Sequence, residues 1–272
     1  MNTNLKLCEM KEKLHVSYSQ INCYLTCPLK YRFQYVEGRI PECVGSGLVF
    51  GKAIHEAAAA FYHSILEDNE PVPESVSSQI FAEMIQKSLD ESPVSFKKGE
   101  DQASILSKGT ELISLLYKRE RPNKVVLVEH PITTNLIHPE TGEASDIALF
   151  GIIDLVEEDE EENKVLVDLK TGANRYDDLK VSTDMQMTIY SHLAIKEGLV
   201  TDENVLLRFD LLLKQKTPSL ENYFTVRSQR DRNRMLKTIF QVLSAVEQGI
   251  FYPTPGWMCS DCGFKQNHCQ EW

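Results

Sequence analysis

Two spacings of apolar residues alternate along this chain and predict its secondary structure. Residues 48–66 combine an alanine run with bulky residues at helical spacing, a pattern typical of a helix packed closely against a sheet. Shorter runs rich in Val, Ile and Leu predict strands. The predicted strands are Lys124–Ile137, Ile147–Val156, Lys164–Lys170, Val205–Lys214 and Tyr223–Val226, and a helix is predicted at Asp184–Glu197.

The order of these elements predicts an α/β fold in a single domain. The helix at Asp184–Glu197 connects the third predicted strand to the fourth, as helices that cover a sheet do. Pro71, Pro73 and Pro93 interrupt two helical patterns between residues 67 and 118, which we interpret as a helical insertion. With 272 residues, of which 42% are hydrophobic, the chain can bury a sizeable core. We therefore expect one domain over residues 1–272.

Candidate chemistry is concentrated where the second and third predicted strands meet. Six consecutive acidic residues, Glu157 to Glu162, separate these strands and predict a solvated hairpin turn. Asp168 and Lys170 are two apart on an extended chain, so their side chains share one face. The hairpin brings Asp154 across to that face. Two carboxylates with waters are enough to hold Mg²⁺ or Mn²⁺ beside a phosphate.

Four residues outside the hairpin are further candidates. His55, in the first predicted helix, offers an imidazole either as a metal ligand or as part of the packing. Glu129 either adds a carboxylate to the site or lies at the surface. Gln186 and Tyr190 are four apart, so they share one helix face. Their amide and phenol either hold a nucleic-acid strand or form ordinary helix surface.

Taken in order, the patterns G-x-x-x-H, G-x-x-D, D-x-K and Q-x-x-x-Y resemble the motif series of the PD-(D/E)XK nuclease superfamily, specifically its RecB-type branch. The segment SYSQINCYLTCPLKYRFQYV is similar to that branch as well, with a serine-capped helix and a cysteine followed by proline and aromatic residues. The resemblance implies a restriction-endonuclease-like core, in which helices flank a mixed central β-sheet. It also implies metal-dependent hydrolysis of DNA phosphodiesters.

The resemblance assigns roles to individual residues. Asp154, Asp168 and Lys170 form the implied catalytic set, with Lys170 orienting the attacking water or stabilising the phosphate in the transition state. The implied substrate-binding pair is Gln186 and Tyr190. The implied ligands of Mg²⁺ or Mn²⁺ are His55, Asp154, Asp168 and the backbone carbonyl of Leu169.

Four cysteines predict a second metal centre. Cys259, Cys262 and Cys269 lie near the C-terminus, in the segment 256–272, and Cys27 lies far upstream. This arrangement resembles the iron–sulfur staple of AddB-type and CRISPR-associated adaptation nucleases, which implies a [4Fe–4S] cluster that joins the two terminal regions. Structural Zn²⁺ is the alternative, with His268 as a substitute ligand.

The remaining cysteines predict no disulfide framework. The chain has seven cysteines, an odd number, and its first residues are too polar for a signal peptide. We expect Cys8, Cys23 and Cys43 to be plain thiols, although Cys23 could replace Cys27 as a ligand. No apolar stretch approaches the length of a membrane span, so we expect a cytoplasmic protein with no membrane partner.

Charge qualifies the prediction of DNA binding. A net charge of −11 opposes attraction to phosphate, but the acidic turn contributes six of the acids. Basic residues outnumber acidic ones from Arg208 to Lys237, and these either line a strand-binding groove or form a solvated helix face. Lys30 and Arg32 lie among aromatic residues. These rings either stack on nucleic-acid bases or pack in the protein core.

The function that these features favour is an exonuclease acting on single-stranded DNA ends, in DNA repair, recombination or CRISPR adaptation. A helicase or a CRISPR adaptation protein is the expected partner. The alternative is a non-catalytic or partner-dependent DNA-binding subunit with the same fold. Zinc hydrolases and P-loop motors are excluded, because His55-Glu56 lacks a second histidine and Gly51-Lys52 lacks the other P-loop residues.

Overall fold

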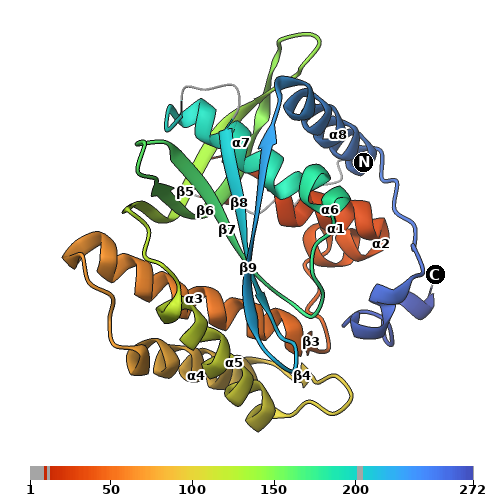
Figure 1. The fold of residues 1–272 in the computed structure, drawn as a ribbon. Coiled ribbons are helices and arrows are strands. Elements are labelled where there is room, and N and C mark those ends of the chain that lie inside the picture. Colours follow the sequence, from red (N-terminus) through yellow and green to blue (C-terminus); the bar gives the residue numbers. More distant parts are fainter. Residues whose placement is uncertain (1–8, 11–12, 201–204, 272) are drawn as a thin grey trace.

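The computed structural model describes residues 9–10, 13–200 and 205–271, and its centre is a mixed β-sheet (Figure 1). The described residues form a seven-stranded sheet in the order β1-β2-β6-β7-β8-β9, with β5 paired to the other edge of β6. Its strands are β1 (Glu9–Met10), β2 (Lys13–Ser17), β5 (Lys124–Ile137), β6 (Ala144–Glu158), β7 (Lys164–Gly172), β8 (Val205–Leu213) and β9 (Ser219–Arg227). The short strands β3 (Val44–Gly45) and β4 (Val94–Ser95) form a separate pair.

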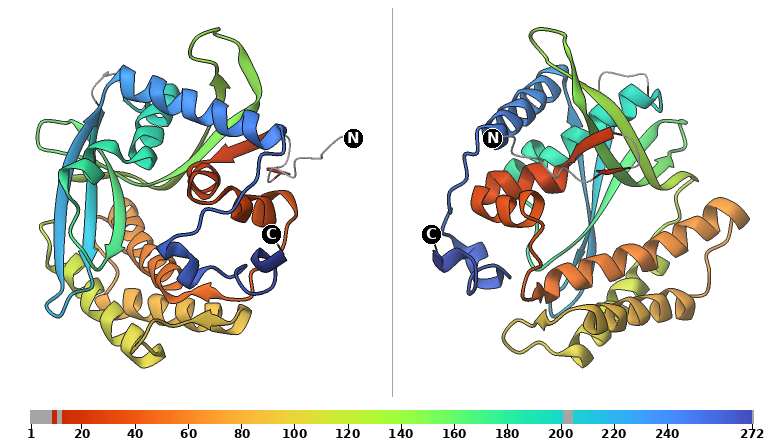
Figure 2. Two further views of the ribbon diagram at one scale, coloured as in Figure 1. Left: turned by 90° about the vertical axis from the view of Figure 1, so that its right-hand side faces the viewer. Right: turned by 180° about the vertical axis from the view of Figure 1, so that it is seen from behind.

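Helices cover both faces of this sheet (Figures 1 and 2). The α-helices are α1 (Tyr18–Thr26), α2 (Pro28–Tyr31), α3 (Ser46–Asp68), α4 (Glu74–Glu91), α5 (Gln102–Lys118), α6 (Asp178–Thr183), α7 (Met185–Glu197) and α8 (Gln229–Glu247). A π-helical turn (Arg32–Val36) and two 3-10 turns (Trp257–Asp261 and Cys269–Glu271) complete the helical elements of the described residues. The serine-capped helix is confirmed, because Ser17 and Gln20 form a reciprocal capping box at the start of α1.

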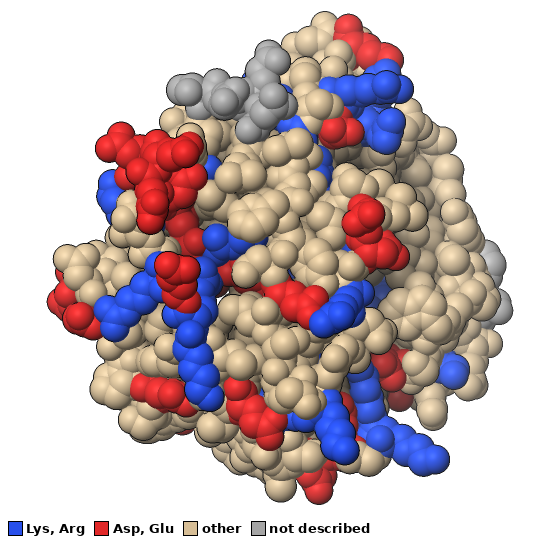
Figure 3. Space-filling view, in the orientation of Figure 1, with Lys and Arg blue, Asp and Glu red and all other residues tan. Residues whose placement is uncertain are grey.

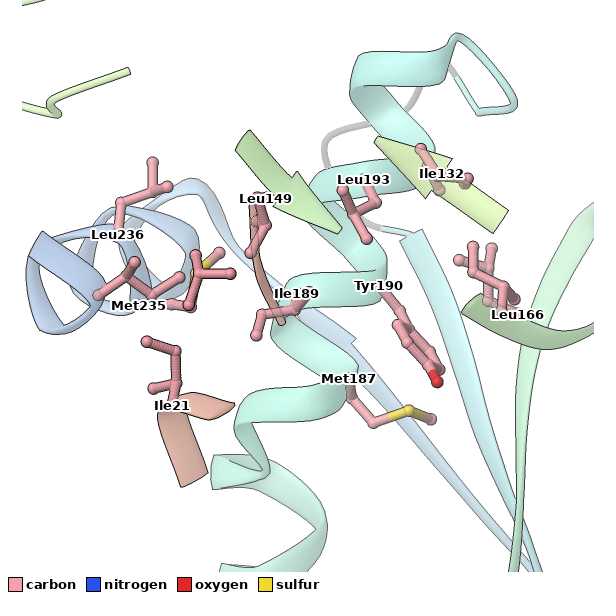
Figure 4. Close-up of a cluster of buried hydrophobic side chains, with 14 of the residues drawn as sticks. Ile21, Ile132, Leu149, Leu166, Met187, Ile189, Tyr190, Leu193, Met235 and Leu236 are labelled. Atoms are coloured by element: carbon pink, nitrogen blue, oxygen red, sulfur yellow. The ribbon is translucent and has the colours of Figure 1, made fainter. Parts of the chain in front are cut away.

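Two hydrophobic clusters lie on opposite faces of the sheet. On one face, side chains from α1, β6, α7 and α8 meet around Ile189 (Figure 4). On the other face, α3, α4 and α5 pack over β7 and its neighbours. Strand β7 supplies Leu166 to the first cluster and Val167 and Leu169 to the second. Because side chains alternate along a strand, Asp168 shares the face of Leu166, which α7 covers.

The predicted fold class, a mixed α/β fold with helices flanking a central sheet, is confirmed. The first predicted strand, Lys124–Ile137, is β5, and its bounds are those of the prediction; β6 and β9 are longer than predicted. β2 and α6 were not predicted. Residues 67–118 contain α4 and α5. No helix in the described ranges combines the length and apolar character needed to cross a membrane.

The acidic run is not entirely a solvated turn, so that prediction is wrong at its first residue. Glu157 belongs to β6 and is 4% exposed. Its carboxylate accepts hydrogen bonds from Arg119 at 3.2 Å and from Arg208 at 2.6 Å. These two guanidinium groups balance the buried charge, which would otherwise be too costly to bury.

Several basic residues that suggested a nucleic-acid surface are internal. Arg208, Arg227 and Arg232 are buried and bonded to other protein groups. Arg208 does line a surface pocket of about 500 Å³, but Glu157, Glu158, Asp159 and Glu160 line it as well, so the pocket is not a basic groove. Tyr31 and Phe33 are buried as well, which confirms core packing as the role of these aromatic rings. Figure 3 shows basic and acidic side chains mixed on one face of the molecule rather than a continuous basic band.

Candidate metal centre and cysteine cavity

The candidate metal centre lies where the sheet forks. One edge of β6 pairs with β2 through Ala148–Phe150 and with β7 only from Leu155 onward. In the ladders of the described strands, residues 151–154 pair with neither strand on this edge. The Asp154 carboxylate instead accepts a hydrogen bond from the backbone N–H of Leu169, at 2.8 Å. Asp154 is therefore held at the point where the β6–β7 ladder ends.

Three side chains from different elements converge beside this fork. His55 of α3 places Nδ1 3.5 Å from Asp154 Oδ2 and 3.9 Å from Glu129 Oε1. One ligand atom from each of the three residues lies within 4.8 Å of the other two. This set of an imidazole and two carboxylates is suited to a divalent cation.

Glu129 reaches the site through an unusual backbone conformation. It stands between the pairs Val128–Leu155 and His130–Ile153, opposite Asp154. Its φ is 46°, in the left-handed region that side-chain-bearing residues rarely adopt. Such strain is typical of functional sites. The sequence left the role of Glu129 open, and counting the register across the hairpin is the signal that places it opposite Asp154.

Asp168 supplies the observation that tests whether a cation fits. It is 0% exposed, and its Oδ1 accepts a hydrogen bond from Lys170 Nζ at 2.8 Å. Its Oδ2 is buried and has no hydrogen-bond partner among the described residues. A buried carboxylate oxygen without a partner is costly, and a cation beside Asp154 would satisfy it. The predicted sharing of one face by Asp168 and Lys170 is confirmed by their contact.

The electrostatics of the site favour cation binding. Burial, and then the charge of Asp168, raise the pKa of Asp154 to about 7. Burial opposes protonation of Lys170, but Asp168 and Asp154 together raise its pKa above the usual value, so it is charged at neutral pH. Burial likewise opposes protonation of His55, while the neighbouring carboxylates of Glu129 and Asp154 raise its pKa. The site therefore holds excess negative charge that a divalent ion would neutralise.

Gln186 and Tyr190 lie together on α7, as the spacing predicts. Gln186 Nε2 donates to the Tyr190 hydroxyl at 2.7 Å. Burial, followed by the charges of Asp154 and Asp168, raises the pKa of Tyr190. A Cβ added at Gly151 would lie 2.6 Å from Leu193 Cδ1, so the glycine lets α7 pack tightly on β6. The role of the pair in holding substrate stays a prediction.

A buried ionic network lies behind the candidate metal centre. Arg119 Nη1 donates to Asp210 at 2.8 Å and also to the Tyr62 hydroxyl, while Arg208 bonds the same aspartate. A cavity of about 10 Å³ separates this network from the candidate ligands, roughly the room that one water needs. Its lining includes His55, Tyr62, Glu129, Asp154 and Asp210. The network thus fixes α3 against the sheet behind the metal centre.

The four predicted cluster cysteines line one cavity, between the α1–α2 region and the C-terminal segment. Its volume is about 90 Å³, and its lining includes Cys27, Cys259, Cys262 and Cys269. Burial and the neighbouring sulfurs of the other three raise the pKa of Cys269. Backbone hydrogen bonds from Leu29 to Tyr252 and from Glu42 to Gly263 hold the C-terminal segment beside the α1–α2 region (Figure 2).

The structure also separates the alternative ligands from the cavity. Cys23 packs against the cluster of α1, α7 and α8 and does not line the cavity, and neither does Cys43. His268 is also absent from the lining, and its Nδ1 faces Arg39. All six cysteines in the described ranges are free thiols, and Cys8 lies outside those ranges. No three of the cavity sulfurs lie within 4.8 Å of one another in the part of the chain that the structure describes.

The chain is similar to known proteins in sequence and in fold. The model of the family described as PD-(D/E)XK nuclease superfamily matches residues 15–270. A "Putative exonuclease" from Eubacterium rectale has a similar solved structure, with 11% sequence identity and a TM-score of 0.55, over 94% of this chain and 87% of that one. The structure of SSO0001 aligns with 13% identity and a TM-score of 0.45, over 98% of this chain and 91% of that one. No curated protein matches the sequence.

Proposed function

The chain belongs to the PD-(D/E)XK nuclease superfamily, and from this membership and the geometry of the fork we propose that it is a metal-dependent nuclease that hydrolyses DNA phosphodiesters. The observation that carries the proposal is the buried Asp168 Oδ2, which has no hydrogen-bond partner in the described part of the chain, together with the converging groups of His55, Glu129 and Asp154. A purely structural carboxylate would be fully hydrogen-bonded.

Four side chains and one carbonyl would hold the metal. His55, Glu129 and Asp154 are the three whose ligand atoms lie within 4.8 Å of one another. Asp168, with its buried unpartnered oxygen, and the backbone carbonyl of Leu169 complete the set that the family resemblance implies. A bound Mg²⁺ or Mn²⁺ supplies an activated water and neutralises charge on the phosphate. The hydrogen bond from Leu169 N–H orients the Asp154 carboxylate, and the left-handed backbone at Glu129 turns that side chain toward it.

Lys170 and the Gln186–Tyr190 pair act on the substrate. Lys170 is held by Asp168, and 27% of its side chain is exposed, so its ammonium can reach a phosphate oxygen. Fixed positive charge stabilises the negative charge that develops on the phosphate. The Gln186–Tyr190 hydrogen bond fixes both polar groups near the acids, where they would hold the DNA strand.

An exonuclease acting on single-stranded ends is the finer form of this proposal. The neighbour from Eubacterium rectale is described as an exonuclease, which motivates the idea, although the likeness itself shows only a shared fold. Roles in DNA repair, recombination or CRISPR adaptation, and a helicase or adaptation partner, stay predictions from the sequence.

Cleavage of end-labelled DNA tests the nuclease. Single-stranded, double-stranded and circular DNA are incubated with anaerobically purified protein in Mn²⁺ or in EDTA. We expect cleavage only with metal, and loss of cleavage in Asp168→Ala. The matched control is Asp146→Ala, an exposed aspartate on β6. Circular DNA that is never cut would identify an exonuclease, whereas equal activity of Asp168→Ala would contradict the site.

We propose further that the cysteine cavity holds a [4Fe–4S] cluster rather than zinc. A Zn²⁺ ion with Zn–S bonds near 2.3 Å draws its four sulfurs to about 3.8 Å from one another. The cavity sulfurs are not gathered that closely, which favours a larger group. The cluster would be structural, because it joins residue 27 to the C-terminal segment.

Metal content and colour test the cluster. We expect four irons per chain and little zinc in protein prepared without oxygen. Cys262→Ala should lose the colour and the stability, whereas Cys43→Ala, outside the cavity lining, should keep both. One zinc per colourless chain would refute the cluster.

A further inference from the structure

Two tyrosines outside the motif series lie beside the fork, on different elements. Tyr18 is the first residue of α1 and follows Ser17, whose pairing with Phe150 is the last of the β2–β6 ladder before the fork. Tyr176 lies between β7 and α6, six residues after Lys170. Both side chains are partly exposed. The fork therefore brings two phenols to the end of the strand that carries Lys170.

The rings of both tyrosines are held in place. Tyr176 packs edge-to-face on Phe209, with ring centroids 5.4 Å apart, and against Tyr223 at 5.8 Å. The Lys180 ammonium lies 5.6 Å from the centroid of the Tyr176 ring. Tyr18 packs against the hydrophobic cluster around Ile189. Fixed rings leave little freedom to the hydroxyl groups, which suits a preorganised binding site.

The two hydroxyl groups are donors without an acceptor among the described residues. Neither phenol donates a hydrogen bond to another group in the described ranges. Burial raises the pKa of each to about 12, and both phenols also feel the charges of Asp184, Lys170 and Asp168. Both phenols are therefore protonated at neutral pH. The Tyr176 ring packs on Phe209, which pairs with Asp168 across the β7–β8 ladder. Two neutral donors beside one ammonium suit the oxygens of a phosphate.

We propose that Tyr18, Tyr176 and Lys170 form a binding site for the scissile phosphate of DNA, with the two phenolic O–H groups donating to its non-bridging oxygens. This inference rests on the proposed nuclease function. It adds two substrate-contacting residues that neither the motif series nor the family match assigns. In this proposal the phosphate is bound by the hydroxyl groups and not by the ring faces. Removal of the hydroxyl groups alone should therefore weaken binding of the phosphate.

Four variants separate hydroxyl bonding from ring packing. Tyr18→Phe and Tyr176→Phe keep the rings and remove hydroxyl groups that bond to nothing in the described protein, so both variants should fold and melt like the parent chain. Tyr18→Leu and Tyr176→Leu remove the rings as well. Tyr252→Phe is the control, because Tyr252 is half exposed and its carbonyl is bonded to Leu29 beside the cysteine cavity.

Two assays are run on the anaerobically purified full chain. Cleavage of single-stranded DNA in Mn²⁺ gives kcat/KM, and fluorescence anisotropy of the same oligonucleotide in Ca²⁺, used as a non-catalytic ion, gives its Kd. Hydrogen bonds to a charged acceptor are strong, so each Phe variant should lower kcat/KM about 10-fold and the double variant about 100-fold. The double variant should also weaken DNA binding, while its affinity for Mn²⁺ stays unchanged.

The outcomes distinguish this inference from the proposed function. If the parent chain cleaves DNA and the double Phe variant cleaves and binds equally well, the phosphate site is wrong and the nuclease stands. If only the Leu variants lose activity, the rings act instead of the hydroxyl groups, and the proposal is overturned. If the parent chain binds DNA without cleaving it and the double Phe variant binds more weakly, the phosphate site stands and the nuclease falls. Absence of both cleavage and binding refutes both.

Discussion

Replacing Asp154 with asparagine should stabilise the metal-free protein at alkaline pH. The amide oxygen of the introduced asparagine would still accept the hydrogen bond from Leu169 N–H, which Asp154 accepts at 2.8 Å. The substitution would remove only the negative charge, which burial and Asp168 make unfavourable. A structural residue would behave in the opposite way, because most substitutions of buried polar groups destabilise a protein.

The size of the gain follows from the pKa of Asp154. Folding raises this pKa from 3.8 to about 7, and each pKa unit corresponds to about 1.4 kcal/mol. Above pH 7 the charged form of Asp154 therefore lowers the free energy of unfolding by up to about 4 kcal/mol. The side chain is 12% exposed and keeps some contact with solvent, so we expect a loss of about 2–4 kcal/mol. The folded pKa is raised, so this cost is absent below pH 3.8 and grows as the pH rises to about 7. The variant should accordingly gain most at pH 8 and much less at pH 5.

Equilibrium urea denaturation in EDTA, at pH 8 and pH 5, measures this difference. Mn²⁺ should then stabilise the parent chain and have much less effect on Asp154→Asn, because a ligand that binds the folded state stabilises it. Asp146→Asn, exposed on the same strand, should change the free energy of unfolding by less than about 0.5 kcal/mol. Lower stability of Asp154→Asn at pH 8, or an equal gain at both pH values, would refute the reasoning.

Three further predictions concern the site and its support. Mn²⁺ affinity, measured by EPR, should be about tenfold lower at pH 6 than at pH 8, because the Asp154 proton, with a pKa of about 7, competes with the cation; a flat profile would contradict this. Gly151→Ala should cost about 1–3 kcal/mol and slow DNA cleavage, since the new methyl group would displace Leu193 and with it α7; unchanged melting and cleavage would show that α7 adjusts freely. Arg227→Met should cost about 2–4 kcal/mol in thermal denaturation, because the carbonyls of Val181 and Asp184 lose their donor, whereas exposed Arg230→Met should cost almost nothing.

Short-range patterns in the sequence predicted most of the fold and part of the site. β5 and α7 follow directly from apolar spacing, and the contact between Asp168 and Lys170 follows from the two-residue period of a strand. Gln186 and Tyr190 meet for the same kind of reason, at helical spacing. In each case the partners are separated by no more than four residues, so local geometry alone determines their relation.

Features that depend on distant partners escaped prediction. Glu157 is buried because Arg119 and Arg208, far away in sequence, neutralise it. Glu129 joins the site through a left-handed backbone that the sequence does not reveal, although the cross-strand register places it opposite Asp154. The choice of Cys27 over Cys23, by contrast, agrees with the sequence prediction, because Cys27 lines the cavity and Cys23 packs against the core cluster.

The make-up of the cysteine cavity also determines when it can be completed during synthesis. Cys27 leaves the ribosome early, whereas Cys259, Cys262 and Cys269 leave it more than two hundred residues later. The strands and helices through α8 end at Glu247, so the sheet can form around the candidate metal centre while the cavity still lacks three of its four sulfurs. Insertion of the proposed cluster would therefore be a late step, acting on a chain that is already largely folded. Scarcity of the metal would then leave a population of nearly finished molecules with loose terminal regions, rather than unfolded chains.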